Sequence, residues 1–209
     1  MNVLTTSTDD LTLEGRFQRP QTSVLGGALI LHPHPAFGGH MDVWLLPSIA
    51  QALAEQGWAS LRINFRGVEG SQGVQSGGRD ENRDAEGALE WLRREVPDVP
   101  LAVVGWSFGA MIGLRLGLLV DCWVGIGPPT RRIPQVPLEG TLIPDELPPR
   151  RTVIVGEHDQ FFPPSTVDVI EAHQVVVVPG ADHFMFDRDP EVARKVCEAV
   201  ERPLYEGAA

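Results

Sequence analysis

Three residues whose side chains together perform acyl transfer each follow a separate apolar run of this chain. Ser107, Asp159 and His183 occur in that order, after residues 101–104, 153–156 and 175–178 respectively. A serine hydroxyl attacks a carbonyl carbon when a histidine accepts its proton and a carboxylate orients the histidine. The three residues therefore predict a nucleophile, an acid that orients the base, and a base.

The immediate surroundings of Ser107 strengthen this interpretation. The serine lies in Gly105-Trp106-Ser107-Phe108-Gly109, between an apolar run typical of a strand and a helix-compatible run over 110–119. In a strand–turn–helix of this kind, the serine sits on a strained turn with its hydroxyl exposed. Residues two before and two after it must lack a Cβ for the strand and helix to approach closely. The two glycines meet that requirement.

Asp159 and His183 each lie just beyond a predicted strand, and each has a nearby competitor. In open parallel sheets, ligands bind outside the carboxyl ends of the strands, where side chains from successive strands meet. His158 lies on the strand side of the acid, and Asp182 shares its loop with the base. We therefore prefer Asp159 and His183, although an aspartate after a strand is often only a turn former.

A second loop, after the apolar run 24–31, is expected to complete the reaction site. Acyl transfer requires two N–H donors for the oxyanion, and one is predicted to be the backbone N–H of Phe108. Pro33 and Pro35 have no N–H, so His34 is the first donor available in this loop, with Phe37 or the Gly38-Gly39 pair as alternatives.

The same loop is rich in histidine, which raises the question of a metal site. His32, His34 and His40 have no carboxylate or cysteine at ligand spacing except Asp42. We therefore predict no metal, and interpret His32 as a buried histidine bonded to the backbone below the site.

Phe37, in the expected oxyanion loop, and Trp106, beside the nucleophile, are predicted to contact the substrate. Arg66 follows the predicted strand 58–64 and has two interpretations. It could hold a substrate carboxylate, or it could form an ion pair that fixes its own loop, and we favour the ion pair. The other tryptophans, Trp44 among them, are interpreted as core.

Strands and helices alternate along the chain. Strands are predicted at 11–17, 24–31, 58–64, 101–104, 122–126, 153–156 and 175–178, and helices at 43–56, 80–95, 110–119, 165–172 and 190–201. This pattern predicts an α/β fold, a doubly wound, mostly parallel sheet of about seven strands with helices on both faces. One domain over residues 1–209 without a large cap is expected, with residues 11–17 as the edge strand.

The stretch from Gly127 to Arg150 differs from the rest of the chain in composition. Seven of its 24 residues are proline, and it contains no periodic segment long enough for a helix. Loops of this length in compact domains are mostly functional or disordered. We call residues 127–150 the flap and predict that it forms one wall of the acyl pocket.

Composition limits the possible partners. The 209 residues are 43% hydrophobic, and 17 basic against 28 acidic residues give a net charge of −11. The charge and the lack of a basic cluster argue against nucleic acid and anionic membranes as partners. Neither a secretory leader nor a membrane-spanning run is recognised, and the two distant cysteines predict buried free thiols, so a cytoplasmic protein is expected.

Taken together, the motifs resemble those of a known group. His32-Pro33-His34-Pro35 with Gly38-Gly39, Asn64-Phe65-Arg66-Gly67 with Ser71, the Ser107 motif, Gly156-Glu157-His158-Asp159 and Gly180-Ala181-Asp182-His183-Phe184 are similar to motifs of the small, lidless α/β-hydrolases of bacteria, near the dienelactone-hydrolase and X-Pro-dipeptidyl-peptidase-like branches. The order Ser, Asp, His is that of the α/β-hydrolases. A dienelactone hydrolase would carry cysteine in place of Ser107.

The resemblance implies a carboxylic-ester hydrolase, with Ser107, Asp159 and His183 as its triad. It implies a small-molecule ester substrate and no cofactor. A peptidase or thioesterase with the same triad is one alternative. A catalytically idle binding protein on the same fold is another.

Overall fold

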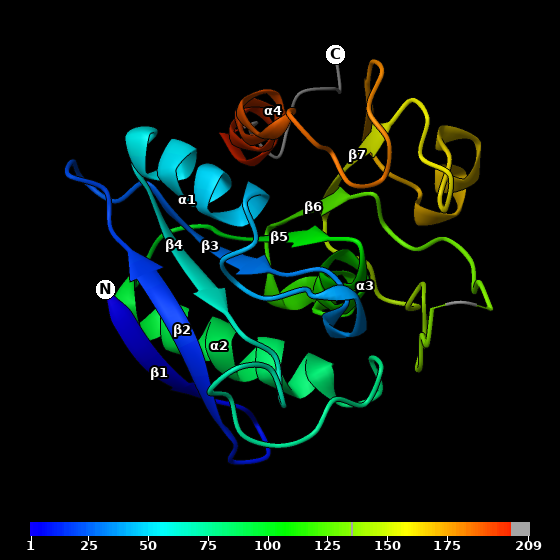
Figure 1. Cartoon of the computed structure of the whole chain (residues 1–209). Helices are drawn as coiled ribbons and strands as arrows, with labels where there is room; N and C mark the ends of the chain where they lie inside the picture. Colours follow the sequence, from blue (N-terminus) through cyan, green and yellow to red (C-terminus); the bar gives the residue numbers. More distant parts are fainter. Residues whose placement is uncertain (135, 202–209) are drawn as a thin grey trace.

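A single eight-stranded sheet forms the centre of the computed structural model, which describes residues 1–134 and 136–201 (Figure 1). The strands are β1 Asn2–Thr6, β2 Thr12–Gln18, β3 Gly26–Leu31, β4 Trp58–Ile63, β5 Leu101–Trp106, β6 Cys122–Ile126, β7 Arg150–Gly156 and β8 Gln174–Val178. The α-helices are α1 Leu45–Glu55, α2 Glu81–Glu95, α3 Phe108–Leu114 and α4 Asp189–Glu201. Short 3₁₀ helices cover η1 Pro35–Phe37, η2 Gly117–Leu119 and η3 Pro164–Ile170.

The strand order is β1-β2-β4-β3-β5-β6-β7-β8. Strands β4, β3, β5, β6, β7 and β8 run parallel, whereas β1 and β2 are antiparallel to their neighbours. Every residue of β3, β4, β5 and β6 is buried. Fully buried, mainly apolar strands of this kind are expected where a parallel sheet is covered on both faces.

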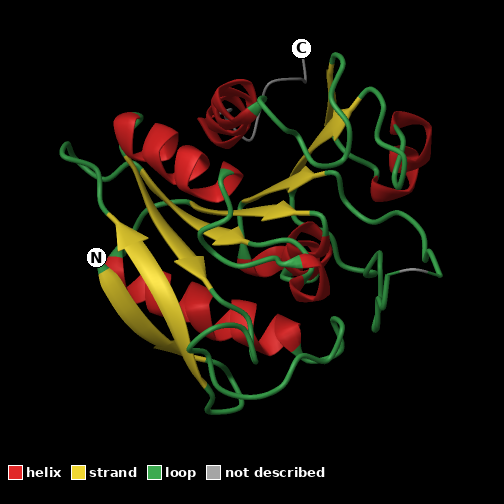
Figure 2. Ribbon diagram, viewed as in Figure 1, coloured by secondary structure: helices red, strands yellow, loops and turns green. Residues whose placement is uncertain are grey.

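Helices cover both faces of the sheet, as Figure 2 shows. Helices α1 and α4 contribute to one apolar core, and α2 and α3 contribute to the other. In α1 the buried residues recur at the spacing of one helical face, namely Leu45, Leu46, Ile49, Ala50 and Leu53. The predicted α/β, mostly parallel, doubly wound fold is confirmed.

The first strand was missed by the sequence analysis. Residues Asn2–Thr6 pair antiparallel with β2, so residues 12–18 form the second strand and not the sheet edge. Because an edge strand has one solvated side, β1 is mostly polar and buries only Thr5 fully. Its polar composition is the reason that it gave no apolar signal.

The other elements differ from the predictions mainly in their ends. The predicted helix over 110–119 is divided into α3, which ends at Leu114, and the short η2. The residues predicted as a helix over 165–172 form the 3₁₀ helix η3. Both cysteines are buried and free, as expected.

The connection between β6 and β7 has no helix or strand in its described residues, so no cap domain is inserted there. Its backbone is tied to the body of the protein at several points. The guanidinium of Arg115 donates hydrogen bonds to the carbonyls of Gly78, Glu139 and Thr141. In the part of the chain that the structure describes, no helix is long and apolar enough to cross a bilayer.

Candidate active site

The turn that carries Ser107 connects the end of β5 to the start of α3. Ser107 has φ 52° and ψ −113°, a conformation that an L-residue adopts only under strain. A Cβ on Gly105 would come within 2.3 Å of the Gly109 carbonyl oxygen, and one on Gly109 within 2.3 Å of the Leu31 carbonyl oxygen. The glycines therefore allow the close approach of strand and helix that the sequence motif predicts.

Two hydrogen bonds join Ser107 to side chains from two other strand ends. The Ser107 Oγ lies 3.0 Å from His183 Nε2, and His183 Nδ1 lies 2.8 Å from Asp159 Oδ2. Asp159 follows β7 and His183 follows β8, while Ser107 follows β5. With Nδ1–H donating to the carboxylate, Nε2 is free to accept the serine proton, which is the tautomer that a general base requires.

The surroundings of Asp159 fix the orientation of its carboxylate. Its Oδ1 accepts the backbone N–H groups of Phe161 and Phe162, at 2.9 and 2.8 Å, which leaves Oδ2 for His183. The competing Asp182 accepts the N–H of Phe184 in a local turn, and His158 is exposed beside Glu157. Neither competitor is joined to Ser107.

One backbone N–H group in the loop after β3 has no hydrogen-bond acceptor among the described residues. The N–H groups of Ala36, Phe37, Gly38 and Gly39 all donate hydrogen bonds within the loop. Pro33 and Pro35 have none, so His34 carries the one N–H of residues 33–39 that has no acceptor among the described residues. At the start of α3 the Phe108 N–H likewise has no acceptor there, as expected for the first residue of a helix.

These two donors lie in segments that pack together. The rings of His34 and Phe108 are 4.7 Å apart, and Gly109 is in close contact with the end of β3. The His34 imidazole is fixed at both nitrogens, because Nδ1 accepts the Ala36 N–H and Nε2 lies 3.1 Å from the Pro137 carbonyl oxygen. Burial lowers the pKa of His34, which favours the neutral ring that these bonds require.

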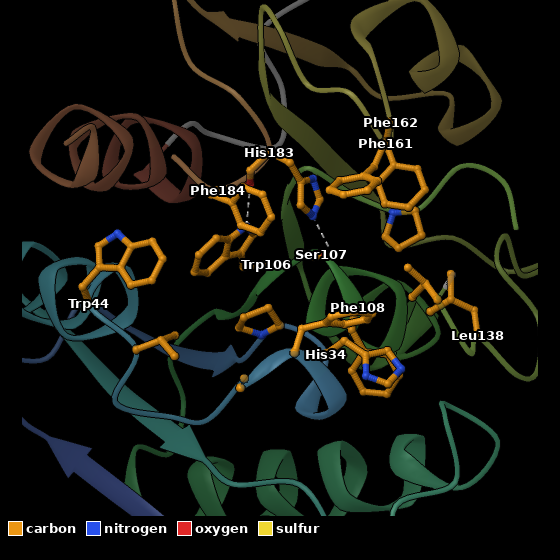
Figure 3. Close-up of a pocket in the computed structure, with 17 residues that line it drawn as sticks. His34, Trp44, Trp106, Ser107, Phe108, Leu138, Phe161, Phe162, His183 and Phe184 are labelled. Atoms are coloured by element: carbon orange, nitrogen blue, oxygen red, sulfur yellow. Dashed lines mark hydrogen bonds between the residues drawn. The ribbon is translucent and has the colours of Figure 1, made fainter. Parts of the chain in front are cut away.

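A pocket of about 230 Å³ opens over Ser107 and His183 (Figure 3). None of its lining residues is an Asp, Glu, Lys or Arg. The lining comprises Pro33, His34, Phe37, Gly38, Gly39, Val43, Trp44, Trp106, Ser107, Phe108, Pro129, Val136, Leu138, Phe161, Phe162, His183 and Phe184. The pocket is therefore suited to an uncharged, apolar ligand.

Comparison with known proteins places this geometry in a family. A family model described as the alpha/beta hydrolase fold matches residues 29–149, more than half of the chain. The chain belongs to the α/β-hydrolase fold family. The predicted resemblance to the small, lidless bacterial members of this family is confirmed by similar proteins from bacteria, one of which is described as a serine hydrolase without lid.

Relatives of this hydrolase-fold chain come from several bacteria. The uncharacterized protein RP471 of Rickettsia prowazekii is 30% identical over 198 residues, which cover 88% of this chain and 82% of that protein. The structure of XC6422 from Xanthomonas campestris, described as an α/β serine hydrolase without lid, is 25% identical with a TM-score of 0.85. That match covers 97% of this chain and 94% of the other.

A further similar structure is an α/β serine hydrolase homologue from Coxiella burnetii. It is 27% identical, with a TM-score of 0.80, over 95% of this chain and 96% of that one. The likeness extends over almost the whole of both chains, so this hydrolase fold contains no large inserted or missing part relative to these two structures.

Arg66, for which a substrate contact was the less favoured of two interpretations, is not among the residues that line the pocket of this hydrolase fold. Its guanidinium contacts Asp84 at 2.7 Å and Asp9 at 2.9 Å, and its backbone N–H donates to the Asp84 carboxylate. Hydrogen bonds from Arg66 lower the pKa of Asp9 to about 2. The alternative expectation, an ion pair that fixes the loop, describes the contacts that the structure has.

His32 has the structural role expected from the sequence. The ring is fully buried; Nε2 accepts the Phe65 N–H, and Nδ1 lies 2.7 Å from the Pro33 carbonyl oxygen. Burial lowers its pKa to about 3. The described residues contain no group of three or more His, Cys, Asp or Glu side chains that could hold a metal ion.

Several aromatic lining residues were missed by the sequence analysis. Trp44 was interpreted as core but is 41% exposed at the pocket, and Phe161, Phe162 and Phe184 were not singled out. The available signal was their position, because each phenylalanine lies in the loop that also carries Asp159 or His183. Large apolar residues beside a reacting group at a strand end are suited to line its pocket.

Proposed function

We propose that this chain is a serine hydrolase that cleaves a small, uncharged carboxylic ester through an acyl-enzyme intermediate. The observation that carries the proposal is the hydrogen-bond chain Ser107–His183–Asp159, which opens into an apolar pocket. Such a chain activates a hydroxyl that is otherwise a weak nucleophile near neutral pH.

In the proposed acylation step, His183 Nε2 takes the Ser107 proton as Oγ forms a bond to the ester carbonyl carbon. The carbonyl oxygen becomes an oxyanion that accepts hydrogen bonds from the N–H groups of Phe108 and His34. Each such donor contributes about 3–4 kcal/mol to stabilisation of the transition state. The bond from carbon to the alcohol oxygen then breaks, and the alcohol leaves with the proton from Nε2.

Deacylation repeats these steps with water as the nucleophile. His183 accepts a proton from the water as its oxygen attacks the acyl-enzyme carbonyl, and the proton returns to Ser107 Oγ when the acid leaves. Asp159 remains ionised throughout, holds the imidazole tautomer through Nδ1 and stabilises the imidazolium. No cofactor takes part in this scheme.

The pocket lining favours an ester over a peptide substrate. Its described residues offer no carboxylate for a peptide amino terminus and no cation for a peptide carboxylate. The test must distinguish this esterase from a peptidase or thioesterase with the same triad and from a catalytically idle binding protein.

The test has two parts. A fluorophosphonate probe should label Ser107, as located by mass spectrometry of the digested protein, and Ser107→Ala protein should stay unlabelled. A panel of alkyl esters, matched thioesters and short peptides should then show turnover of the esters. The absence of labelling would contradict the enzyme proposal, and faster turnover of thioesters or peptides would replace the ester by one of the alternatives.

A further inference from the structure

Three exposed aromatic side chains near the reacting residues lie against one another. Trp44, at the start of α1, is 41% exposed, while Phe184 and Phe186, in the loop after β8, are 37% and 59% exposed. Large apolar surface in contact with water is unfavourable unless a ligand or partner covers it. We call these three residues the aromatic rim.

The rings of the aromatic rim form a stack. Trp44 and Phe186 lie 4.9 Å apart with 13° between their planes, and Phe184 lies 5.7 Å from Phe186 at 28°. Trp106 meets Trp44 edge-on at 5.1 Å. Rings that are already arranged in this way present flat faces and edges at which a further aromatic ring can stack or pack edge-to-face.

The loop that carries the two phenylalanines is anchored in the protein. Met185, between them, is fully buried in the core beneath α4, and the Phe184 N–H donates to the Asp182 carboxylate. Because the loop is fixed with the Met185 side chain in the core, the side chains of Phe184 and Phe186 are held at the surface.

Two members of the aromatic rim, Trp44 and Phe184, line the same pocket as Ser107 and His183. Phe184 follows His183, with ring centroids 5.7 Å apart, and the Trp106 Nε1–H donates to the His183 carbonyl. Figure 3 shows Trp44, Trp106 and Phe184 on one side of Ser107, with Leu138, Phe161 and Phe162 on the other. A group bound on the aromatic side is therefore close enough to be part of the ester that Ser107 attacks.

We propose that the aromatic rim is a subsite for an aromatic ring carried by the uncharged ester substrate. This inference rests on the proposed hydrolase function and names its substrate class. The substrate is an ester in which an aryl group is attached to the carbonyl carbon or to the alcohol oxygen, either directly or through one or two carbons. The lining, which has no Asp, Glu, Lys or Arg side chain, fits such a ring.

The kinetic test compares esters that differ only in aromaticity. Methyl phenylacetate is paired with methyl cyclohexylacetate for the acyl half, and benzyl acetate with cyclohexylmethyl acetate for the alcohol half. Acid release is followed with a pH indicator, and each kcat/KM is divided by the alkaline hydrolysis rate of the same ester. Because cyclohexyl is larger and more apolar than phenyl, a pocket that recognises only apolar area prefers the cyclohexyl member of each pair.

In at least one pair we expect the aromatic ester to be favoured about 3- to 10-fold, the size of one stacking interaction. The preference should disappear in Trp44→Leu and persist in part in Trp44→Phe, which keeps a ring. Trp91→Leu is the matched control, since Trp91, on α2, packs against Phe17 and does not line the pocket. It should keep the wild-type ratio.

A binding measurement decides the inference even if no ester is turned over. Calorimetry with Ser107→Ala protein compares 4-phenyl-2-butanone with 4-cyclohexyl-2-butanone, and the phenyl ketone should bind about 3- to 10-fold more tightly. Equal or weaker binding of the phenyl ketone, or a preference that survives Trp44→Leu, would overturn the aromatic subsite. If the aromatic subsite is overturned but Ser107 is still labelled by the fluorophosphonate and the wild-type protein hydrolyses methyl butanoate, the hydrolase proposal stands.

Discussion

Asp159 owes its position beside His183 to its own backbone surroundings. Two N–H groups, from Phe161 and Phe162, hold one carboxylate oxygen, so the other faces the imidazole at 2.8 Å. Asp182 is nearer to His183 in sequence, but its carboxylate is engaged by the Phe184 N–H. The local turn around each aspartate thus decides which one reaches the histidine.

Asp159→Asn should lower kcat by about 10⁴-fold. The asparagine carbonyl can still accept the two backbone N–H groups, so its amide would face Nδ1 and favour the wrong tautomer of His183. Asp182→Asn serves as the control, because asparagine can accept the Phe184 N–H equally well and activity should stay near the wild-type value. Similar losses in the two variants would contradict the assignment.

Ser107→Ala should remove ester hydrolysis, with a loss of about 10⁶-fold in kcat, because no other hydroxyl takes its place in the hydrogen-bond chain. The fold should remain, as circular dichroism can establish, since the change removes one oxygen atom at the pocket surface. Retention of more than about a hundredth of the wild-type rate would exclude Ser107 as the nucleophile, given the size of the expected loss.

At the scale of elements, the flap is tied to both the oxyanion loop and the body of the protein. The Pro137 carbonyl is bound by the His34 imidazole, and Arg115 bridges the flap to the loop before α2. Next to these anchors, Val136 and Leu138 line the pocket. We therefore propose that the flap forms one wall of the acyl pocket, as predicted from the sequence, and that it limits the size of the acyl group.

Leu138→Ala should shift the preferred acyl chain to a longer one, because the removed side chain leaves space in the pocket wall. Turnover of an acetyl ester should change less than that of a hexanoyl or octanoyl ester. Leu147→Ala is the matched control, since this leucine belongs to the same flap and packs against the core outside the pocket. An unchanged chain-length profile in Leu138→Ala would mean that the flap has no part in substrate choice.

At the scale of the whole molecule, the buried His32 and the partly exposed Asp9 connect stability to pH. Burial lowers the pKa of His32 from 6.5 to about 3, and Arg66 lowers that of Asp9 from 3.8 to about 2. At these two groups the unfolded chain therefore binds more protons in acid than the folded protein does. Both groups contribute stability at neutral pH that is lost as pH falls, over about 6.5 to 3 for His32 and about 3.8 to 2 for Asp9.

The free energy of unfolding, measured by urea titration, should therefore fall steadily as pH is lowered from 7 to 4. His32→Gln should be less stable than wild type at pH 8, because it alters the bonds to Phe65 and Pro33. Its stability should depend less steeply on pH between 6.5 and 4. Equal slopes for the two proteins would show that His32 is not the group responsible.

The sequence alone was sufficient to predict the turn at Ser107 and the placement of Ser107, Asp159 and His183 after three strands of the sheet. These features have local signatures, because apolar runs mark buried strands, and parallel strands place the loops at their carboxyl ends along one edge of the sheet. The sequence also shows that Pro33 and Pro35 have no N–H group, which leaves His34 as the first backbone donor of that loop.

Only the tertiary structure decided what Arg66 and Trp44 contact. Arg66 binds Asp9, 57 positions away, and Trp44 stacks on Phe186 from the other end of the chain. Polar β1 was also revealed only by its pairing with β2. Contacts between segments so distant in sequence have no local pattern, because they depend on how the sheet brings its loops together.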